Sequence, residues 1–388
     1  MIRVGYRPVV AAGIESAASV GGALMPPVMG AAAFVMVEIT GIPYADIVVA
    51  ATIGAILYYF AILAAVHFEA KQAGMAPMPL RDIPAWREVA QDAHLVIPII
   101  VLVWLMMDRW SGNYAAFCST IAMVGIAALR RRSRMGWRQV LDSLANAGLT
   151  MAPLAVSIAG AGIVVSALTA TGLVVALGGI IKDLAAGNFA FLLVLLALTV
   201  LVLGMGIPTT PSYIIAAAIG VPQILDLGSK ALGLSPDALL LPAHLFIFYF
   251  AVLADASPPV AAAAFAAAAI AKSSPLMASM HATRLGIAGF TVGFAFLYDP
   301  GIMLRGSLLD IIVATAIQAG ALTAICAAYA GFLVAPMAMP VRLLLGFGGL
   351  FAAFYHGVPD TVRLAVALGV PGGIALAQTL LAPKPVRP

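Results

Sequence analysis

The chain has 388 residues, of which 63% are hydrophobic and only 9% are charged. A water-soluble protein of this length needs far more charge to cover its surface, so the composition excludes an ordinary soluble protein. The net charge of +4 is modest and gives no indication of nucleic-acid binding. The mean hydropathy of +1.09 instead predicts a protein that lies in a lipid bilayer.

Apolar runs that approach the thickness of a bilayer recur along the whole sequence and predict about ten crossings by α-helices. Between the third and fourth of these runs, residues 130–138 contain five arginines, and the positive-inside rule places such a loop in the cytoplasm. The predicted fold class is therefore an all-α polytopic membrane protein. The runs cover residues 48–66, 95–107, 114–129, 150–176, 189–203, 239–252, 285–297, 311–334, 343–354 and 364–381.

The stretch "GMGIPTTPSYIIAAAIGVP", residues 204–222, interrupts strongly apolar sequence. Irregular backbone at membrane depth survives only inside protein or beside a water-filled cavity. The apolar run before Gly204 can form one half-helix, and Pro208 suits the first turn of a second one. We therefore expect a re-entrant hairpin over 204–222, with its tip at residues 204–210 and a second arm, residues 211–219, that is too short to cross.

The tip of such a hairpin has the chemistry of an ion site. Carbonyl groups at the end of one half-helix and N–H groups at the start of the other are unpaired, and Thr209, Thr210 and Ser212 can cap some of those N–H groups. Transporters build cation and anion sites from these parts. A kink or a close helix contact that needs glycine is the alternative interpretation.

Two further helix breaks carry paired prolines. "LADASPPVAAAAF" places Pro258 and Pro259 in an apolar span, where neither can donate a backbone hydrogen bond, so the helix over 239–272 must open there. Near the start of the chain, "SVGGALMPPVMGAAAF" places Pro26 and Pro27 after a Gly-Gly pair. Both breaks share the pattern P-P-V-x-x-A-A, and a recurring break predicts a duplicated transporter fold with its site between the repeats.

Few other polar residues lie in the apolar spans. Asp255 is one of very few carboxylates there, and burial of a carboxylate is unfavourable unless it is paired or functional. His244 and Arg284 fit interfacial positions. Cys118 and Cys326 are isolated and suggest neither a disulfide nor a metal site.

The segments "SVGGALMPPVMGAAAF", "GMGIPTTPSYIIAAA", "HLFIFYFAVLADASPPVAAAAFAAAAIA" and "MHATRLGIAGFTVGFAFLYDPGIML" closely resemble the large membrane subunit of tripartite ATP-independent periplasmic (TRAP) transporters, in its fused-permease form. The resemblance covers residues 1–304. It implies an ion-transporter-like elevator fold, driven by a sodium gradient, in the bacterial inner (cytoplasmic) membrane. It also implies import of a small organic anion delivered by a periplasmic substrate-binding protein of the TRAP-associated extracytoplasmic immunogenic type.

The resemblance further implies a coupling-ion and substrate site at the three helix breaks. Sodium is expected at Gly204, Gly206, Thr209, Thr210 and Ser257, because carbonyl and hydroxyl oxygens are hard ligands. The full set of implied site residues is Gly21, Gly22, Pro26 and Pro27 of the first break, Gly204, Gly206, Pro208, Thr209 and Thr210 of the hairpin tip, and Asp255, Ser257, Pro258 and Pro259 of the second break.

The sequence departs from the family at its start. A complete fused permease has the small subunit's helices, several scaffold helices and the first hairpin before the residue that matches Met1. We therefore expect a fold that is incomplete at the N-terminus, as a fragment, a truncated gene or one half of a split protein whose missing N-terminal permease part is a partner. Residues 305–388 are expected to add C-terminal transmembrane helices.

Other classes of function are alternatives to transport. An intramembrane enzyme needs a catalytic pair, and the sequence contains no H-E-x-x-H, G-x-G-D or G-x-S-x-G motif. We expect no enzyme activity, no catalytic residue and no cofactor, with Na+ as a coupling ion only. A channel stays open as an alternative, because helix breaks also build selectivity filters, and so does a permease fragment that does not transport.

Overall fold

The computed structural model describes residues 1–75, 85–86, 90, 93–129 and 133–381. Regular structure within these residues is helical, apart from one isolated bridge between Phe332 and Pro336. The predicted all-α class is confirmed. The arginines at positions 130–132, part of the expected cytoplasmic loop, lie outside the described residues, as does the C-terminal tail at 382–388.

The first part of the chain forms a helix that is broken in its middle. After a short turn, η1 (Ile2–Val4), helix α1 covers Pro8–Gly21 and helix α2 covers Ala31–Thr40. The residues between them form turns, as the glycines and paired prolines there predict. Helix α3, Tyr44–Gln72, is continuous and long enough to span a membrane.

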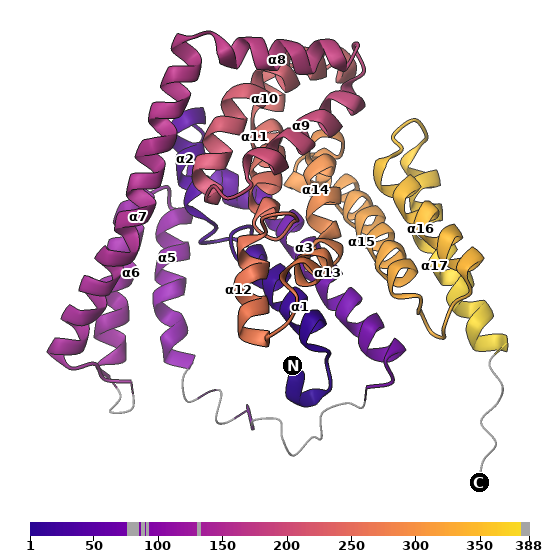
Figure 1. The fold of residues 1–388 in the computed structure, drawn as a ribbon, viewed down its shortest axis with the longest axis horizontal. Coiled ribbons are helices and arrows are strands. Elements are labelled where there is room, and N and C mark those ends of the chain that lie inside the picture. The colour runs from indigo at the N-terminus through magenta and orange to yellow at the C-terminus, as the bar shows by residue number, and fades with distance from the viewer. Residues whose placement is uncertain (76–84, 87–89, 91–92, 130–132, 382–388) are drawn as a thin grey trace.

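The next helices differ from the expected crossings. Helices α5 (Ile97–Met107) and α6 (Gly112–Ala127) follow the short η3 (Ala93–Val96) and pack against each other. At 11 and 16 residues they are shorter than the roughly 20 residues that one crossing needs. Helix α7 (Trp137–Ala170) is longer than expected and leads to α8 (Leu173–Leu184), which lies across the upper end of the molecule in Figure 1.

Helices α9 (Phe189–Leu203) and α10 (Thr209–Leu232) form the expected hairpin. It starts at the upper end of the molecule, its tip lies in the middle, and α10 returns to the upper end beside α9 (Figure 1). The expectation that the second arm ends at residue 219 is wrong, because α10 continues through Pro222 to Leu232. A proline inside a packed membrane helix is tolerated where neighbouring groups compensate for the lost hydrogen bond.

A second broken helix follows the hairpin. Helix α11 runs from the upper end of the molecule to the middle, and α12 continues from the break towards the opposite end (Figure 1). Two short helices, α13 and α14, then meet at an angle of 42° and together are long enough to span a membrane. The bounds are α11 (Pro236–Ala254), α12 (Ala262–Ala271), α13 (Pro275–Leu285), α14 (Ile287–Tyr298) and the short η4 (Pro300–Met303).

The two broken helices run in opposite directions and pack crosswise. Helix α1, which precedes the first break, packs against α12, which follows the second break; α2 packs against α11 in the same way. Helix α2 also contacts α10 of the hairpin. The two breaks are therefore held at the same depth of the molecule, as expected for an inverted repeat.

Three more helices follow the region that resembles the family: α15 (Leu308–Ala330), α16 (Met339–Phe354) and α17 (Asp360–Leu381). Helix α15 packs against α3 on one side and against α16 and α17 on the other. A buried ion pair joins α17 to the preceding part of the chain: Arg363, only 1% exposed, donates hydrogen bonds of 2.9 and 3.0 Å to the two carboxylate oxygens of Asp299. The described residues 305–381 are thus docked onto the rest of the molecule.

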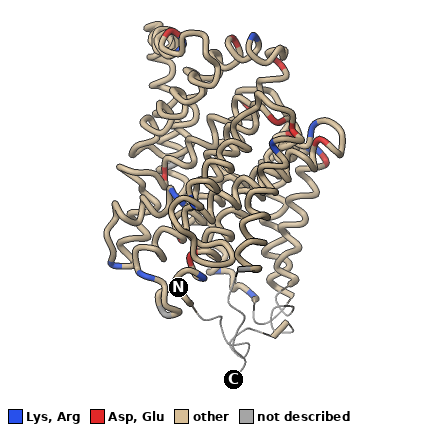
Figure 2. Tube along the Cα trace, turned by 90° about the vertical axis from the view of Figure 1, so that its right-hand side faces the viewer, with Lys and Arg blue, Asp and Glu red and all other residues tan. Residues whose placement is uncertain are grey.

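Six of the described helices, α3, α7, α10, α11, α15 and α17, are long and apolar enough to cross a membrane, and the bent pair of α13 and α14 makes up to seven. This is fewer than the ten crossings expected, because several apolar runs end in short helices. Most charged residues lie towards the two ends of the molecule (Figure 2). The protein is a multi-pass membrane protein.

Candidate functional site

The hairpin tip lies against the second helix break. The Thr209 hydroxyl donates a hydrogen bond of 2.6 Å to the carboxylate of Asp255, the first residue after α11. Gly204 lies so close to the end of α11 that an added Cβ would be 2.3 Å from the Cβ of Ala254. The family resemblance implies one site at the three helix breaks, and the structure brings the hairpin tip and the second break together.

Two residues of the tip determine its backbone path. Gly206 has a φ of 75°, a left-handed conformation that glycine adopts without a steric penalty. Pro208 is the residue directly before α10 and has no N–H group to be left unpaired. The chain therefore reverses direction between α9 and α10 within five residues, 204–208.

The tip and the break both present free carbonyl oxygens. Within the described residues, no hydrogen bond reaches the carbonyl oxygens of residues 203–207 or those of residues 257–260. Unpaired carbonyls are unfavourable in apolar surroundings, and here two sets of them lie on segments that touch. Carbonyl oxygens are the ligands that hard cations prefer.

Hydroxyl groups add to this set of oxygens. Thr210 is 4% exposed and Ser257 is 8% exposed. The Ser257 hydroxyl donates its hydrogen to the Leu253 carbonyl at 2.8 Å, so the lone pairs of its oxygen are available to a cation. Both residues were expected to bind sodium; the structure places them at the tip and the break, and their binding role stays a prediction.

The start of α10 is not capped in the expected way. No side chain accepts a hydrogen bond from its first N–H groups, although Thr209, Thr210 and Ser212 were expected to do so. The Thr209 hydroxyl is bonded to Asp255 instead, and the Ser212 hydroxyl is buried without a hydrogen-bond partner among the described residues. The positive end of the α10 dipole therefore points at the tip with free N–H groups.

Asp255 is the carboxylate of this site. Within the described part of the chain, no group of three or more His, Cys, Asp or Glu side chains could hold a metal ion. One carboxylate among several neutral oxygens does not resemble a calcium or transition-metal site, which uses more charged ligands or nitrogen and sulfur. Such a donor set suits a monovalent hard cation.

At the first break, several carbonyl oxygens already accept hydrogen bonds, whereas those of residues 257–260 at the second break accept none from the described residues. The Tyr44 hydroxyl, at the start of α3, lies 3.1 Å from the Pro27 carbonyl oxygen and 2.7 Å from that of Val28. The Gly21 carbonyl already accepts two backbone hydrogen bonds, and an added Cβ at Gly21 would be 2.4 Å from the Tyr58 ring. Gly21 is thus packed closely against Tyr58, and its place in the coupling-ion and substrate site stays a prediction.

The other expected residues of the first break lie in the turns between α1 and α2. Gly22 and Pro26 have carbonyls that no hydrogen bond reaches in the described structure. Pro26 and Pro27 form a cis peptide bond, as do Pro258 and Pro259, so the shared P-P-V pattern corresponds to a shared backbone geometry. The structure brings the tip together with the second break, and α2, which follows the first break, packs against α10.

Sequence reasoning missed two polar contacts near these breaks. Tyr44 could not be identified from the sequence, because a tyrosine at the start of a helix is not part of a recognisable motif. His244 was expected at the interface, which is wrong: it is 3% exposed and its Nδ1 lies 2.7 Å from the hydroxyl of Tyr213 on α10. This pair joins α10 to α11 behind the tip.

Comparison with known protein families identifies the family of the chain. The family model described as "Tripartite ATP-independent periplasmic transporter, DctM component" matches residues 1–304. Searches of curated proteins and of solved structures found no match. The matched family consists of membrane permease components of transporters, and these associate with a periplasmic binding protein and a small membrane component. Since the match covers most of the chain, from the first broken helix to η4, the chain belongs to the family of DctM components of TRAP transporters.

Proposed function

We propose that the chain is the permease component of a sodium-coupled transporter that imports a small organic anion across a bacterial inner membrane. The observation that carries the proposal is the contact between the hairpin tip and the second break. Two segments with free carbonyl oxygens meet there, and the Thr209–Asp255 hydrogen bond joins them.

Sodium is the cation that this donor set fits best. Neutral carbonyl and hydroxyl oxygens with a single carboxylate bind a monovalent hard ion without an excess of charge. We propose Gly204, Gly206, Thr209, Thr210 and Ser257 as its ligands. Pro258 and Pro259 keep the helix open, because neither can donate a hydrogen bond that would close it.

The anion would lie on the other side of the tip. Free N–H groups at the start of α10 carry the positive end of the helix dipole, which attracts carboxylates. In transporters with broken helices, half-helix N-termini bind anionic groups while unwound carbonyls bind the coupling ion. A bound sodium ion would add positive charge and so favour the anion, which gives the coupling a physical basis.

We also propose that the hairpin and the two broken helices move together as an elevator. Support comes from their mutual packing, since α1 and α2 each pack against the opposite half of the second broken helix. The binding protein would be of the TRAP-associated extracytoplasmic immunogenic type, which delivers the anion from the periplasm. The free carbonyls would face water only while the site is open.

The test is uptake into proteoliposomes that contain the chain, the remaining membrane parts of its transporter and its binding protein. An inward sodium gradient should drive saturable accumulation of the anion, and replacement of sodium by potassium should abolish it. Uptake that is unaffected by the replacement would contradict sodium coupling. A current that does not saturate with anion concentration would indicate a channel instead.

A binding assay on the purified chain separates sodium binding from transport. Sodium, but not potassium, should raise the melting temperature by mass action. Thr209→Val should remove this shift, because it deletes a ligand oxygen. Thr199→Val is the matched control: Thr199 lies on α9 and its hydroxyl donates to the Leu195 carbonyl within the helix, so the sodium shift should persist.

A further inference from the structure

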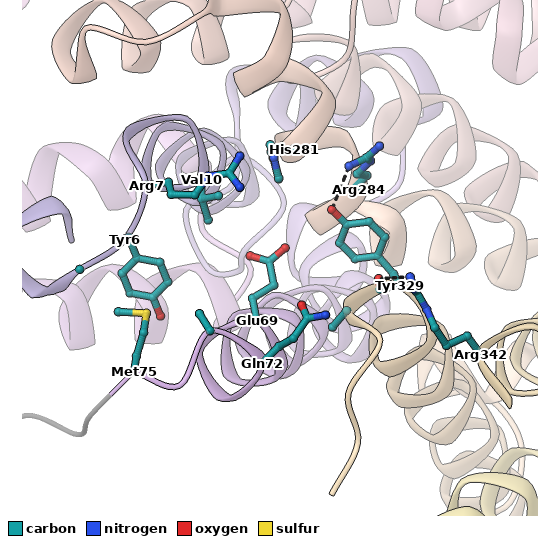
Figure 3. Close-up of a pocket in the computed structure, with 13 residues that line it drawn as sticks. Tyr6, Arg7, Val10, Glu69, Gln72, Met75, His281, Arg284, Tyr329 and Arg342 are labelled. Atoms are coloured by element: carbon teal, nitrogen blue, oxygen red, sulfur yellow. Dashed lines mark hydrogen bonds between the residues drawn. The ribbon is translucent and has the colours of Figure 1, made fainter. Parts of the chain in front are cut away.

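A cavity of about 470 Å³ lies apart from the hairpin tip, between the region that matches the family and the C-terminal helices. The start of α1, the end of α3, helix α13, the end of α15 and the start of α16 contribute to it. Most of these elements meet at the end of the molecule that carries the N-terminus (Figure 1). Its polar lining includes Arg7, Glu69, His281, Arg284, Tyr329 and Arg342 (Figure 3).

Positive charge exceeds negative charge in this cavity. Three arginines, Arg7, Arg284 and Arg342, and one carboxylate, that of Glu69, line it. Arg342 donates hydrogen bonds of 2.9 Å to the carbonyls of Ala328 and Tyr329, which fixes it at the end of α15. Its charge contributes to the field, while the other two arginines are available for binding.

The guanidinium group of Arg284 is held by contacts on one side only. It donates a hydrogen bond of 3.1 Å to the Tyr329 hydroxyl, and its guanidinium carbon lies 5.2 Å from the centre of the same ring. The remaining N–H groups have no acceptor among the described residues. The side chain of Arg7 has neither a hydrogen bond nor an ion pair within that part of the chain. Arg284 was expected at an interfacial position, and the structure places it in the lining of this cavity.

Glu69 lies across the cavity from these arginines (Figure 3). No ion pair within 4.0 Å joins Glu69 to Arg7 or Arg284 in the described residues, and one of its carboxylate oxygens is buried without a hydrogen-bond partner. The Nδ1 atom of His281 is buried and unpartnered as well. Opposite charges thus face each other across a space that neither side fills, although direct contact would be favourable.

We propose that this cavity binds an oxyanion that also carries a hydrogen-bond donor. The carboxylate or phosphate would accept hydrogen bonds from Arg7 and Arg284. A hydroxyl group of the same ligand would donate to Glu69, since a second negative group there would be repelled. The cavity is within the size range of small-molecule sites.

Two kinds of ligand have these groups. One is a free hydroxy acid, and the other is the headgroup of phosphatidylglycerol, which combines a phosphate with hydroxyls. In either case the ligand would connect α1 and α13 of the family region to α15 through Arg284 and Tyr329. The inference does not depend on sodium coupling, because the cavity lies apart from the hairpin tip.

The experiment uses the purified full chain and two variants. Arg7→Gln/Arg284→Gln removes both free guanidinium groups, and Arg305→Gln removes an exposed arginine that does not line the cavity. Melting temperature is measured against increasing malate, and against succinate, which lacks only the hydroxyl. In parallel, native mass spectrometry follows phosphatidylglycerol retained after release from nanodiscs.

A free hydroxy acid is the source if malate raises the melting temperature of wild type and of Arg305→Gln at lower concentration than succinate does. The melting temperature of the double variant should then not respond to malate. Glu69→Gln should then remove the preference for malate. The lipid is the source if neither acid acts, while wild type and Arg305→Gln retain phosphatidylglycerol and the double variant loses at least half of it.

The proposal is wrong if the three proteins respond equally to both acids and retain equal amounts of the lipid. A loss of folding would be visible as a change in size-exclusion profile. Tyr329→Phe, which removes only the hydrogen bond to Arg284, then serves as the milder variant and should weaken binding several-fold.

Discussion

Thr209 donates a hydrogen bond of 2.6 Å to Asp255, a residue 46 positions further along the chain. This contact joins the tip of a helical hairpin to the break of another helix. It orients the threonine oxygen and keeps the carboxylate partnered in apolar surroundings, where an unpaired carboxylate is unfavourable. The two groups therefore depend on each other.

Thr209→Val should lower sodium-driven uptake roughly ten- to hundredfold, because a hydrogen bond to a charged group contributes about 1.5–3 kcal/mol. Thr209→Ser keeps the hydroxyl and should retain most of the activity. Uptake at several sodium concentrations measures the effect, which should be an increase in the sodium concentration for half-maximal uptake. Equal losses in the Val and Ser variants would point to packing rather than the hydroxyl.

Gly204→Ala should damage transport, since its Cβ would lie 2.3 Å from the Cβ of Ala254 and would push the tip away from the second break. Gly179→Ala on α8 is the control, because a Cβ there meets nothing within 4 Å. Gly206→Leu should also damage transport, through the left-handed φ of 75°, which costs about 1–2 kcal/mol in a non-glycine residue. Uptake and detergent stability are measured side by side; wild-type uptake in Gly204→Ala would contradict the close contact.

Pro258→Ala/Pro259→Ala should abolish transport while the protein still inserts and folds. Two new N–H groups would let α11 continue through the break, and a continuous helix would pair the carbonyls of residues 257–260, which are now free, with N–H groups further along the chain. Sodium-dependent uptake and melting temperature in detergent are compared for the double variant. Normal uptake would remove the open helix from the mechanism.

Arg363→Met should destabilise the protein by about 3–5 kcal/mol, the usual cost of removing one partner from a buried ion pair. Asp299 would then be left without its two hydrogen bonds from the guanidinium group. The double variant Asp299→Asn/Arg363→Met should recover part of the loss, because no buried charge is left unpaired. Unfolding in detergent would show this as a non-additive cycle; strict additivity would mean that the pair does not interact.

Stability should fall at acid pH through Asp299, which lies between α14 and α15. Burial by itself raises the pKa of this carboxyl, but His356 and Arg363 outweigh burial and lower the pKa from 3.8 to about 2. Because the folded-state pKa is depressed, the stabilisation is present above the unfolded value and is lost as pH falls from about 4 to about 2. A shift of this size corresponds to about 2.5 kcal/mol.

The measurement for this pH dependence is the melting temperature in detergent between about pH 5 and about pH 2.5. Wild type should lose stability more steeply over this range than Asp299→Asn, which has no carboxyl to titrate at that position. Identical slopes in the two proteins would show that other groups cause the acid sensitivity.

The helix breaks could be predicted from sequence because glycine and paired prolines act locally. Pro26, Pro27, Pro258 and Pro259 each remove a donor, so the interruptions at both positions follow from residue type alone. The length of α10 could not be predicted in this way. Pro222 has the same local effect as the other prolines, and only the surrounding helices decide that the helix continues.

Contacts between distant residues could not be predicted from local sequence patterns. The hairpin tip was matched to the second break through the family resemblance, not through spacing. Tyr44 at the first break, the Tyr213–His244 pair and the Asp299–Arg363 pair join residues 16 to 64 positions apart. In each contact, a polar residue lies in apolar sequence. Taken by itself, such a residue fits an interfacial position equally well.

The buried Arg363 also has a consequence for the order in which the chain enters the membrane. It lies in the first turn of α17, where the helix dipole opposes a positive charge, so the nascent helix is poorly suited to insertion by itself. Its acceptor Asp299 is synthesised 64 residues earlier and can already be in place when α17 leaves the ribosome. We expect α17 to wait at the translocon until the helices that hold Asp299 have assembled, which makes its insertion a late step in biogenesis that depends on the family region.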